Sequence, residues 1–140
     1  MNATVSPAPV VVDASAVVAL LKEADPVIAT AWRGWDEAWR MVLAPPWIWL
    51  ETANALLRGH RLPGARVLAT LDALEATGLE IADRGPDGVR QALQLAERHQ
   101  LTVYDAAYLW LAIDVDGELA TRDAELIRAA EAEGVPLALG

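Results

Sequence analysis

The apolar positions of the chain alternate between short continuous runs and longer segments with helical periodicity. The first run, PVVVD at residues 9–13, consists of consecutive β-branched residues, which is typical of a strand buried on both faces. Further short runs predict four more strands, within MVLAP (41–45), GLEIAD (78–83), GELATRD (117–123, ending near Thr121) and VPLAL (135–139). These runs are separated by segments that predict helices.

Seven segments carry helical periodicity: 14–23, 26–40, 46–58, 65–76, 86–98, 101–112 and 124–133. The resulting order is β-α-α-β-α-α-β-α-α-β-α-β. Strands that alternate with helices predict an α/β fold, here a three-layer α/β/α sandwich around a mostly parallel sheet. We expect one domain over residues 1–140, with residues 1–8 as a flexible extension.

One acidic residue interrupts the apolar helix LTVYDAAYLWLA at residues 101–112. Asp105 lies in a segment whose Leu101, Tyr104, Tyr108 and Leu111 recur at helical spacing. An ionised carboxylate in such surroundings is costly unless it is paired or bound to a metal. Two interpretations follow: a structural Asp that caps the helix or pairs with an arginine, or a ligand.

Three more acids are placed where a parallel sheet binds its ligands. Asp13 ends the first strand, Asp123 follows the fourth, and Glu51 and Asp105 lie on helices that can face the same crevice. Carboxylates gathered at one place repel each other unless a divalent cation holds them. Ligation by oxygen alone is the chemistry of Mg²⁺ or Mn²⁺, so the four acids together predict a site for one of these ions.

Each acid also has a structural interpretation. Asp13 and Asp123 are suited to cap the helices that follow them, and Glu51 can pair with Arg58. The metal site is therefore inferred from the joint placement of the four residues and from no single one.

Three polar residues could support such a site. Ser15 and Thr121 each lie two residues from one of the acids, where a hydroxyl can orient a carboxylate or a metal-bound water, or form only a helix cap or turn. Asn54 follows Glu51 by three residues and can fix its rotamer or serve as an ordinary polar surface residue.

The net charge of −9 argues against a general nucleic-acid coat protein, because such proteins neutralise phosphates with a basic surface. An acidic protein can still act on nucleic acid through bound cations, or bind a basic partner. The absence of cysteine excludes disulfides and thiolate metal sites. No segment matches a signal peptide or a membrane span, so we expect a cytoplasmic protein.

Other enzyme classes fit the residues poorly. A metal-independent ribonuclease needs paired histidines, and His60 and His99 have no evident partner. A phosphoaspartate receiver domain needs a late lysine, whereas the sole lysine is Lys22, and an aspartyl phosphatase needs an Asp at the position of Ser15.

Four blocks of this sequence, VVVDASAVVALL, LETANAL, LTVYDAAYLWLA and LATRDAEL, resemble the PIN-domain family, specifically VapC-type toxins of toxin–antitoxin pairs. The resemblance extends from about Val10 to Leu139. It implies that Asp13, Glu51, Asp105 and Asp123 bind Mg²⁺ or Mn²⁺ and hydrolyse RNA to a 3′-hydroxyl and a 5′-phosphate. The alternative is a PIN-like fold retained only as a protein-interaction module.

The resemblance also implies two protein partners. One is a basic antitoxin that binds in a groove of the toxin. We expect part of the tryptophan cluster to line this groove, and the other interpretation is that the tryptophans pack in the core. The candidate contacts are Trp32, Trp35, Trp47 and Trp49. The other partner is a second copy of the chain, and the helix side with Tyr108 and Trp110 is the expected homodimer contact.

Overall fold

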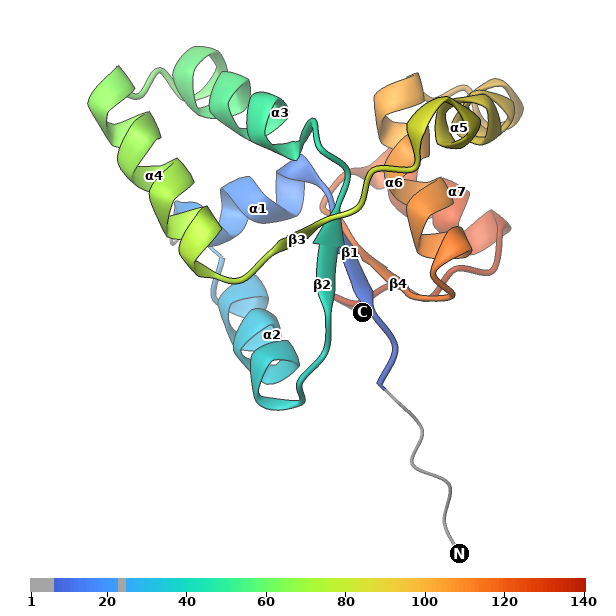
Figure 1. The fold of residues 1–140 in the computed structure, drawn as a ribbon, viewed down its shortest axis with the longest axis horizontal. Helices are drawn as coiled ribbons and strands as arrows, with labels where there is room; N and C mark the ends of the chain where they lie inside the picture. Colours follow the sequence, from blue (N-terminus) through green and yellow to red (C-terminus); the bar gives the residue numbers. More distant parts are fainter. Residues whose placement is uncertain (1–6, 23–24) are drawn as a thin grey trace, which may run out of the picture.

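A computed structural model describes residues 7–22 and 25–140 of the chain, and helices cover both faces of a small parallel sheet (Figure 1). Its four strands are β1 (Val10–Val12), β2 (Val42–Ala44), β3 (Glu80–Ile81) and β4 (Glu118–Ala120), in the order β3-β2-β1-β4. The helical elements are α1 (Ala14–Leu21), α2 (Pro26–Glu37), α3 (Ile48–Asn54), η1 (Ala55–Gly59), α4 (Gly64–Ala76), α5 (Gly85–His99), α6 (Val103–Asp114) and α7 (Ala124–Ala132).

The three-layer α/β/α arrangement predicted from the sequence is confirmed. Helices α1 to α4 lie on one side of the sheet and α5 to α7 on the other (Figure 1). Strand β1 is central, pairing Val10 with Val42 on one side and with Glu118 on the other. All three of its valines have no exposed surface, as a strand between two helical layers requires.

The last predicted strand, VPLAL at 135–139, is reduced to a single bridge beside β4. The Leu119 amide donates to the Pro136 carbonyl and the Ala138 amide donates to the Leu119 carbonyl, both at 2.9 Å. Pro136 has no amide hydrogen to continue the ladder, so the pairing stays short. The prediction of a fifth full strand is therefore wrong.

The helix expected at 46–58 changes its form midway. It begins at Ile48, and from Ala55 it continues as the π-helical turn η1. The His60 amide donates to the Ala55 carbonyl at 2.9 Å, five residues back instead of four. Such π turns inside helices occur frequently at functional sites.

Two of the tryptophans assigned to partner binding belong to the core, which corrects that expectation. Trp32 and Trp35 are 8% and 5% exposed, and their rings lie 5.5 Å apart between centroids. With Ile28 they form the buried face of α2, at the i, i+4, i+7 spacing of an amphipathic helix. Trp47 and Trp49 remain partly exposed.

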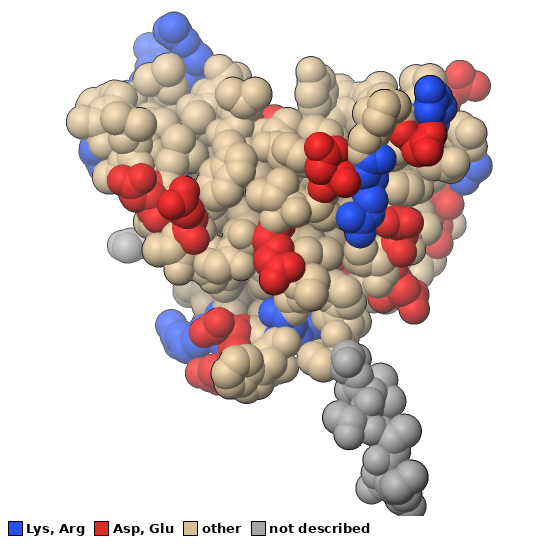
Figure 2. Space-filling view, viewed as in Figure 1, with Lys and Arg blue, Asp and Glu red and all other residues tan. Residues whose placement is uncertain are grey.

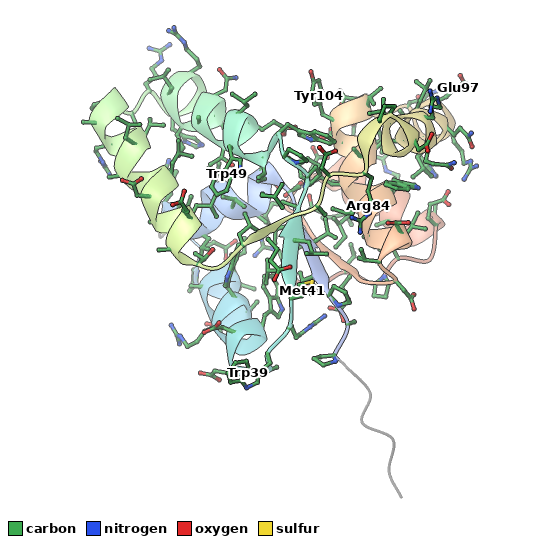
Figure 3. The ribbon with its side chains drawn as sticks, in the orientation of Figure 1. Trp39, Met41, Trp49, Arg84, Glu97 and Tyr104 are labelled. Carbon is green, nitrogen blue, oxygen red and sulfur yellow. The ribbon has the colours of Figure 1, made fainter. Side chains whose placement is uncertain are left out.

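Trp39 does not continue this stripe. It lies beyond the end of α2, has a φ of 59° and is 91% exposed, at the end of the molecule far from Tyr104 (Figure 3). A residue in this left-handed conformation ends the helical periodicity, so its side chain leaves the face that Trp32 and Trp35 share.

The expected flexible extension at 1–8 lies mostly outside the described residues, as does residue 23 at the end of the first predicted helix. Within the described part, the Ala8 carbonyl accepts a hydrogen bond of 2.8 Å from Arg40 Nε, which holds the chain ahead of β1. No helix among the described residues is both long and apolar enough to cross a membrane.

Candidate active site

The four acids singled out in the sequence line one cavity of about 390 Å³. It lies at the carboxyl ends of β1 and β4, where the parallel topology brings the starts of α1 and α7 together. Ten residues line it: Asp13, Ala14, Ser15, Val18, Glu51, Ala55, His60, Asp105, Tyr108 and Asp123.

Asp13 is the most deeply buried of these acids, with 3% of its surface exposed. Its Oδ1 accepts hydrogen bonds from Ser15 Oγ at 2.7 Å and from the Ala16 amide at 2.9 Å, so it also caps α1. Its Oδ2 accepts a hydrogen bond from the Thr121 hydroxyl. The capping interpretation is thus correct for Asp13, without excluding a second role for the same carboxylate.

The two hydroxyls that bind Asp13 also connect the ends of β1 and β4. Ser15 Oγ accepts from the Arg122 amide at 2.9 Å, and Thr121 Oγ1 accepts from the Asp123 amide at 3.0 Å. Both Ser15 and Thr121 therefore orient the Asp13 carboxylate, as the sequence suggested for Ser15. Thr121 bonds the carboxylate of Asp13 and only the backbone of its neighbour Asp123.

Asp123 and Asp105 approach the cavity from two different helices. Asp123 caps α7, since its Oδ1 accepts from the amides of Glu125 and Leu126 at 2.9 and 3.1 Å. Asp105 lies in the first turn of α6, which Thr102 caps by accepting from the Asp105 amide at 3.1 Å. A carboxylate in the first turn is favoured by the helix dipole, which helps to explain Asp105 in an apolar helix.

Glu51 extends into the cavity from α3, opposite Tyr108 on α6. Glu51 Oε1 and the Tyr108 hydroxyl are both buried and form no hydrogen bond of ordinary geometry with a described residue. The hydroxyl still lies close enough to Glu51 to lower the pKa of its carboxyl, so the carboxylate is only partly satisfied and the position favours a further ligand.

Burial and mutual repulsion make these carboxyl groups weak acids. Burial raises the pKa of Asp13 to about 6, although the hydrogen bonds it accepts act in the opposite direction. Burial, with repulsion from Asp105 and Asp13, raises the pKa of Glu51 to about 7. Burial and repulsion from Asp123 raise the pKa of Asp105 as well.

The four acids have no cationic side chain as a partner in the described part of the chain. Arg122, next to Asp123 in sequence, forms its salt bridge with Asp25 at 2.7 Å instead. Within residues 7–22 and 25–140, no three Asp, Glu or His side chains lie close enough together to form a ready metal site. The acids therefore share a cavity while standing apart from one another.

For two residues near Glu51, the structure favours the surface interpretation that the sequence left open. Asn54 is exposed and forms no side-chain hydrogen bond with Glu51, because the side of α3 that it occupies turns away from the cavity. Arg58 is likewise exposed and makes no salt bridge with Glu51.

Two cavity residues were not assigned to the site from the sequence. Tyr108 was expected at a homodimer contact, but it is fully buried and lines the cavity. Its spacing from Asp105, three residues along the same helix, was the available signal. His60 lines the cavity because of the π turn, and no pattern in the sequence predicts that turn.

A model of the PIN domain matches residues 10–132. The chain belongs to the PIN-domain family. Among solved structures, this PIN domain resembles PAE2754 from Pyrobaculum aerophilum, with a TM-score of 0.68, 24% identity, and coverage of 87% of this chain and 79% of the other. It also resembles VapC20 of Mycobacterium tuberculosis, a sarcin-ricin loop cleaving toxin, with a TM-score of 0.68, 22% identity, and coverage of 86% and 94%.

No protein of curated function matches this PIN domain. The two solved structures share its fold, and their low identities leave the chemistry of the site to be argued from its own residues.

The donor set of the cavity fits a hard divalent cation. It offers carboxylate oxygens from Asp13, Glu51, Asp105 and Asp123, and the buried Glu51 Oε1 forms no hydrogen bond of ordinary geometry with a described residue. Oxygen ligands of this kind suit Mg²⁺ or Mn²⁺. These four residues are the ones that would hold the ion.

The raised pKa values predict a stability that falls with pH when no divalent cation is added. Because the folded carboxyls bind protons more tightly than the unfolded ones, the folded state loses stability as pH rises from about 4 to about 7. For Asp13 alone the change is about 2–3 kcal/mol. Urea unfolding at a series of pH values, in the presence of a chelator, measures it.

Glu51→Gln is expected to flatten this pH dependence, because it removes the group whose pKa is about 7. The control is Glu97→Gln on the exposed face of α5, which removes the same charge outside the cavity (Figure 3). An equal pH dependence in both variants would show that the cavity carboxyls do not titrate as described.

Proposed function

We propose that this PIN domain is a Mg²⁺- or Mn²⁺-dependent endoribonuclease, and that it acts as a VapC-type toxin neutralised by a cognate antitoxin. The observation that carries the proposal is the cavity that four carboxylates line without forming a salt bridge to a cationic side chain of the described residues. PIN domains are generally nucleases, and the similar fold of VapC20, a sarcin-ricin loop cleaving toxin, supports RNA as the substrate.

A divalent ion bound at such a site supplies an activated water and charge stabilisation for the phosphodiester. The carboxylates of the chain have different positioning roles. Asp13 is held rigidly by the hydroxyls of Ser15 and Thr121, so its carboxylate offers a fixed direction. Glu51 and Asp105 are less buried and can adjust to the ligand and the substrate.

The protonation of the cavity follows from the same residues. With a pKa of about 7, Glu51 holds a proton part of the time at neutral pH, which relieves the repulsion from Asp105 and Asp13. Since the carboxylates would hold a divalent cation in their ionised form, Glu51 would give up this proton when such a cation binds. Loading with metal should therefore release protons, as expected of a site built from weakened acids.

Asp105→Asn is expected to abolish metal-dependent cleavage while the protein stays folded. The substitution keeps the size of the side chain and removes one ligand charge, and we expect a loss of about a hundredfold or more, as for other charge-stabilising groups. A fluorescence assay on RNA with Mg²⁺ or Mn²⁺ measures the rate, and circular dichroism measures folding.

Glu97→Gln again serves as the control and should retain the wild-type rate. Undiminished cleavage by folded Asp105→Asn would reject the assignment of this acid. No cleavage of any RNA by the wild type, with or without metal, would favour the alternative of a silent interaction module.

The proposed antitoxin should use the surface beside the acids. Trp47 lies 6.4 Å from Tyr104 and 6.5 Å from Tyr108 between ring centroids, so it borders the carboxylate cavity. With Val89, Val103, Tyr104 and Ala107 it lines a second, apolar cavity of about 340 Å³. A basic segment could place an apolar anchor there and a positive side chain among the carboxylates, in contact with Trp47 and Trp49.

Trp47→Ala and Asp13→Asn are each expected to weaken antitoxin binding, because one removes the apolar contact and the other a charge. Trp39→Ala, which removes an indole that is 91% exposed and remote from Tyr104, should leave it unchanged (Figure 3). Surface plasmon resonance on the folded variants measures the affinity, and raised salt should slow association. If neither of the first two variants binds more weakly than Trp39→Ala, the antitoxin binds elsewhere.

We also propose a homodimer, although not through the contact expected from the sequence. Tyr108 is buried, whereas Leu93 on α5 and Ile113 on α6 are 55% and 41% exposed, so exposed apolar residues of these two helices supply the surface. Light scattering should give a mass near twice 15.0 kDa. A monomer at the highest attainable concentration would contradict the proposal.

A further inference from the structure

The cavity that holds the carboxylates continues as a groove between α1 and α3–η1. From the acids it passes Val18 on α1 and Ala55 on η1 and reaches His60. Figure 1 shows the two helices on the same side of the sheet. The end at His60 is chemically different from the end at the acids.

The π turn is what places His60 on this groove. Because the His60 amide bonds to the carbonyl five residues back, His60 lies under Ala55 and on the face of the helix that carries Glu51. In an ordinary α-helical turn Gly59 would take that place and the histidine would be rotated away by about 100°. The π turn thus places the imidazole of His60 at the end of the groove.

The only lysine of the chain lies against this imidazole. Lys22 caps the end of α1, one turn beyond the groove residue Val18, and its Nζ lies 2.8 Å from His60 Nδ1. An ammonium group donates and does not accept, so Nδ1 must be the acceptor and Nε2 carries the hydrogen. The pair therefore offers a cation and an N–H donor together.

The charges around the pair make this corner of an acidic protein basic. Arg58 and Arg61 are exposed in the same segment as His60 and form no salt bridge with a described residue. Figure 2 shows Lys and Arg gathered at the upper left, over the end of α3 and the loop to α4. By contrast, five other arginines are engaged with acids: Arg40, Arg84, Arg90, Arg98 and Arg122.

We propose that Lys22 and His60 bind a backbone phosphate of the RNA strand that neighbours the scissile one, with Arg58 and Arg61 extending the basic rim. The inference rests on the proposed ribonuclease function and adds the path of the strand. Along α1 the rise of about 1.5 Å per residue puts Lys22 roughly 14 Å from Asp13. The pair is therefore too far away to act on the phosphate at the carboxylates.

The basic end of the groove compensates for the repulsion between the carboxylates and the phosphates of RNA. A strand that approaches four carboxylates is repelled, and a contact to one further phosphate offsets that repulsion and fixes the register of the strand. The bases and backbone of a single strand are accessible to side chains, and RNA recognition by proteins mostly targets unpaired segments, so the substrate class we assign is unpaired RNA. Lys22 and His60 are positioning residues in this scheme.

The test compares strand binding in matched variants of the full chain. Each variant carries Asp105→Asn so that the RNA stays intact, and fluorescence anisotropy follows a labelled ten-nucleotide single-stranded RNA over a range of salt concentrations. Lys22→Gln is expected to weaken binding about five- to tenfold and to reduce the salt slope by about 0.7, the value for one phosphate contact on a single strand. His60→Asn should weaken binding less, and Lys22→Arg should restore most of the affinity.

Arg128→Gln is the charge-matched control, because this arginine is exposed on α7 and lies outside the groove. With Asp105 restored, Lys22→Gln should raise KM by the same factor and leave kcat within about twofold, as expected for a contact that positions the strand.

Several outcomes would overturn the inference. Equal binding by Lys22→Gln and Arg128→Gln would show that the pair does not contact RNA, whether or not the wild type cleaves it. A loss confined to kcat would place the pair at the chemistry and not on the strand. If a ten-residue polyglutamate peptide binds as tightly and shows the same dependence on Lys22, the rim recognises acidic chains in general and the assignment to RNA fails. Absence of cleavage by the wild type with the binding differences intact would instead reject only the ribonuclease proposal.

Discussion

The hydrogen-bonded burial of Asp13 is the constraint on which the site depends. A carboxylate with 3% of its surface exposed would be strongly disfavoured without donors, and three of them meet it from two strand–helix junctions. Ser15 and Thr121 each bond both the carboxylate and the backbone after β4. The same bonds therefore join β1 to β4, cap α1 and fix one ligand direction. A change in any of them moves the fold and the cavity together.

The remaining acids reach this fixed point from elements that pack independently. Glu51 comes from α3, Asp105 from α6 and Asp123 from α7, and these helices lie on both sides of the sheet (Figure 1). Their meeting is a property of the parallel topology, because every strand ends at the same edge. No local motif holds the four acids, which explains why they share a cavity and yet stand apart. Charge repulsion works against closing that gap unless a cation occupies it.

This dependence on topology also explains how far the sequence could predict the molecule. The order of strands and helices was readable from periodicity, and once the order was known, the shared edge placed Asp13, Glu51, Asp105 and Asp123 in one cavity. Periodicity does not report depth, so the stripe of Trp32 and Trp35 looked the same whether it faced a core or a partner. Periodicity also does not predict a π-helical turn, so the position of His60 in the cavity could not be expected. The spacing of three residues suggested a contact between Asn54 and Glu51 that the structure does not contain.

The overall charge of −9 describes this protein poorly, because it is not spread evenly. Five arginines are paired with acids, four of them with acids far along the chain, and these pairs neutralise them away from the groove. Lys22 instead contacts a histidine and forms no salt bridge with a described residue, at the end of a cavity that begins with carboxylates. Since charges separated by more than about 8–10 Å are largely screened at physiological salt, the two ends of the groove act as separate sites of opposite sign. A polyanion with a cation at one phosphate is complementary to that arrangement, whereas the net charge alone argues only against a protein that coats nucleic acid.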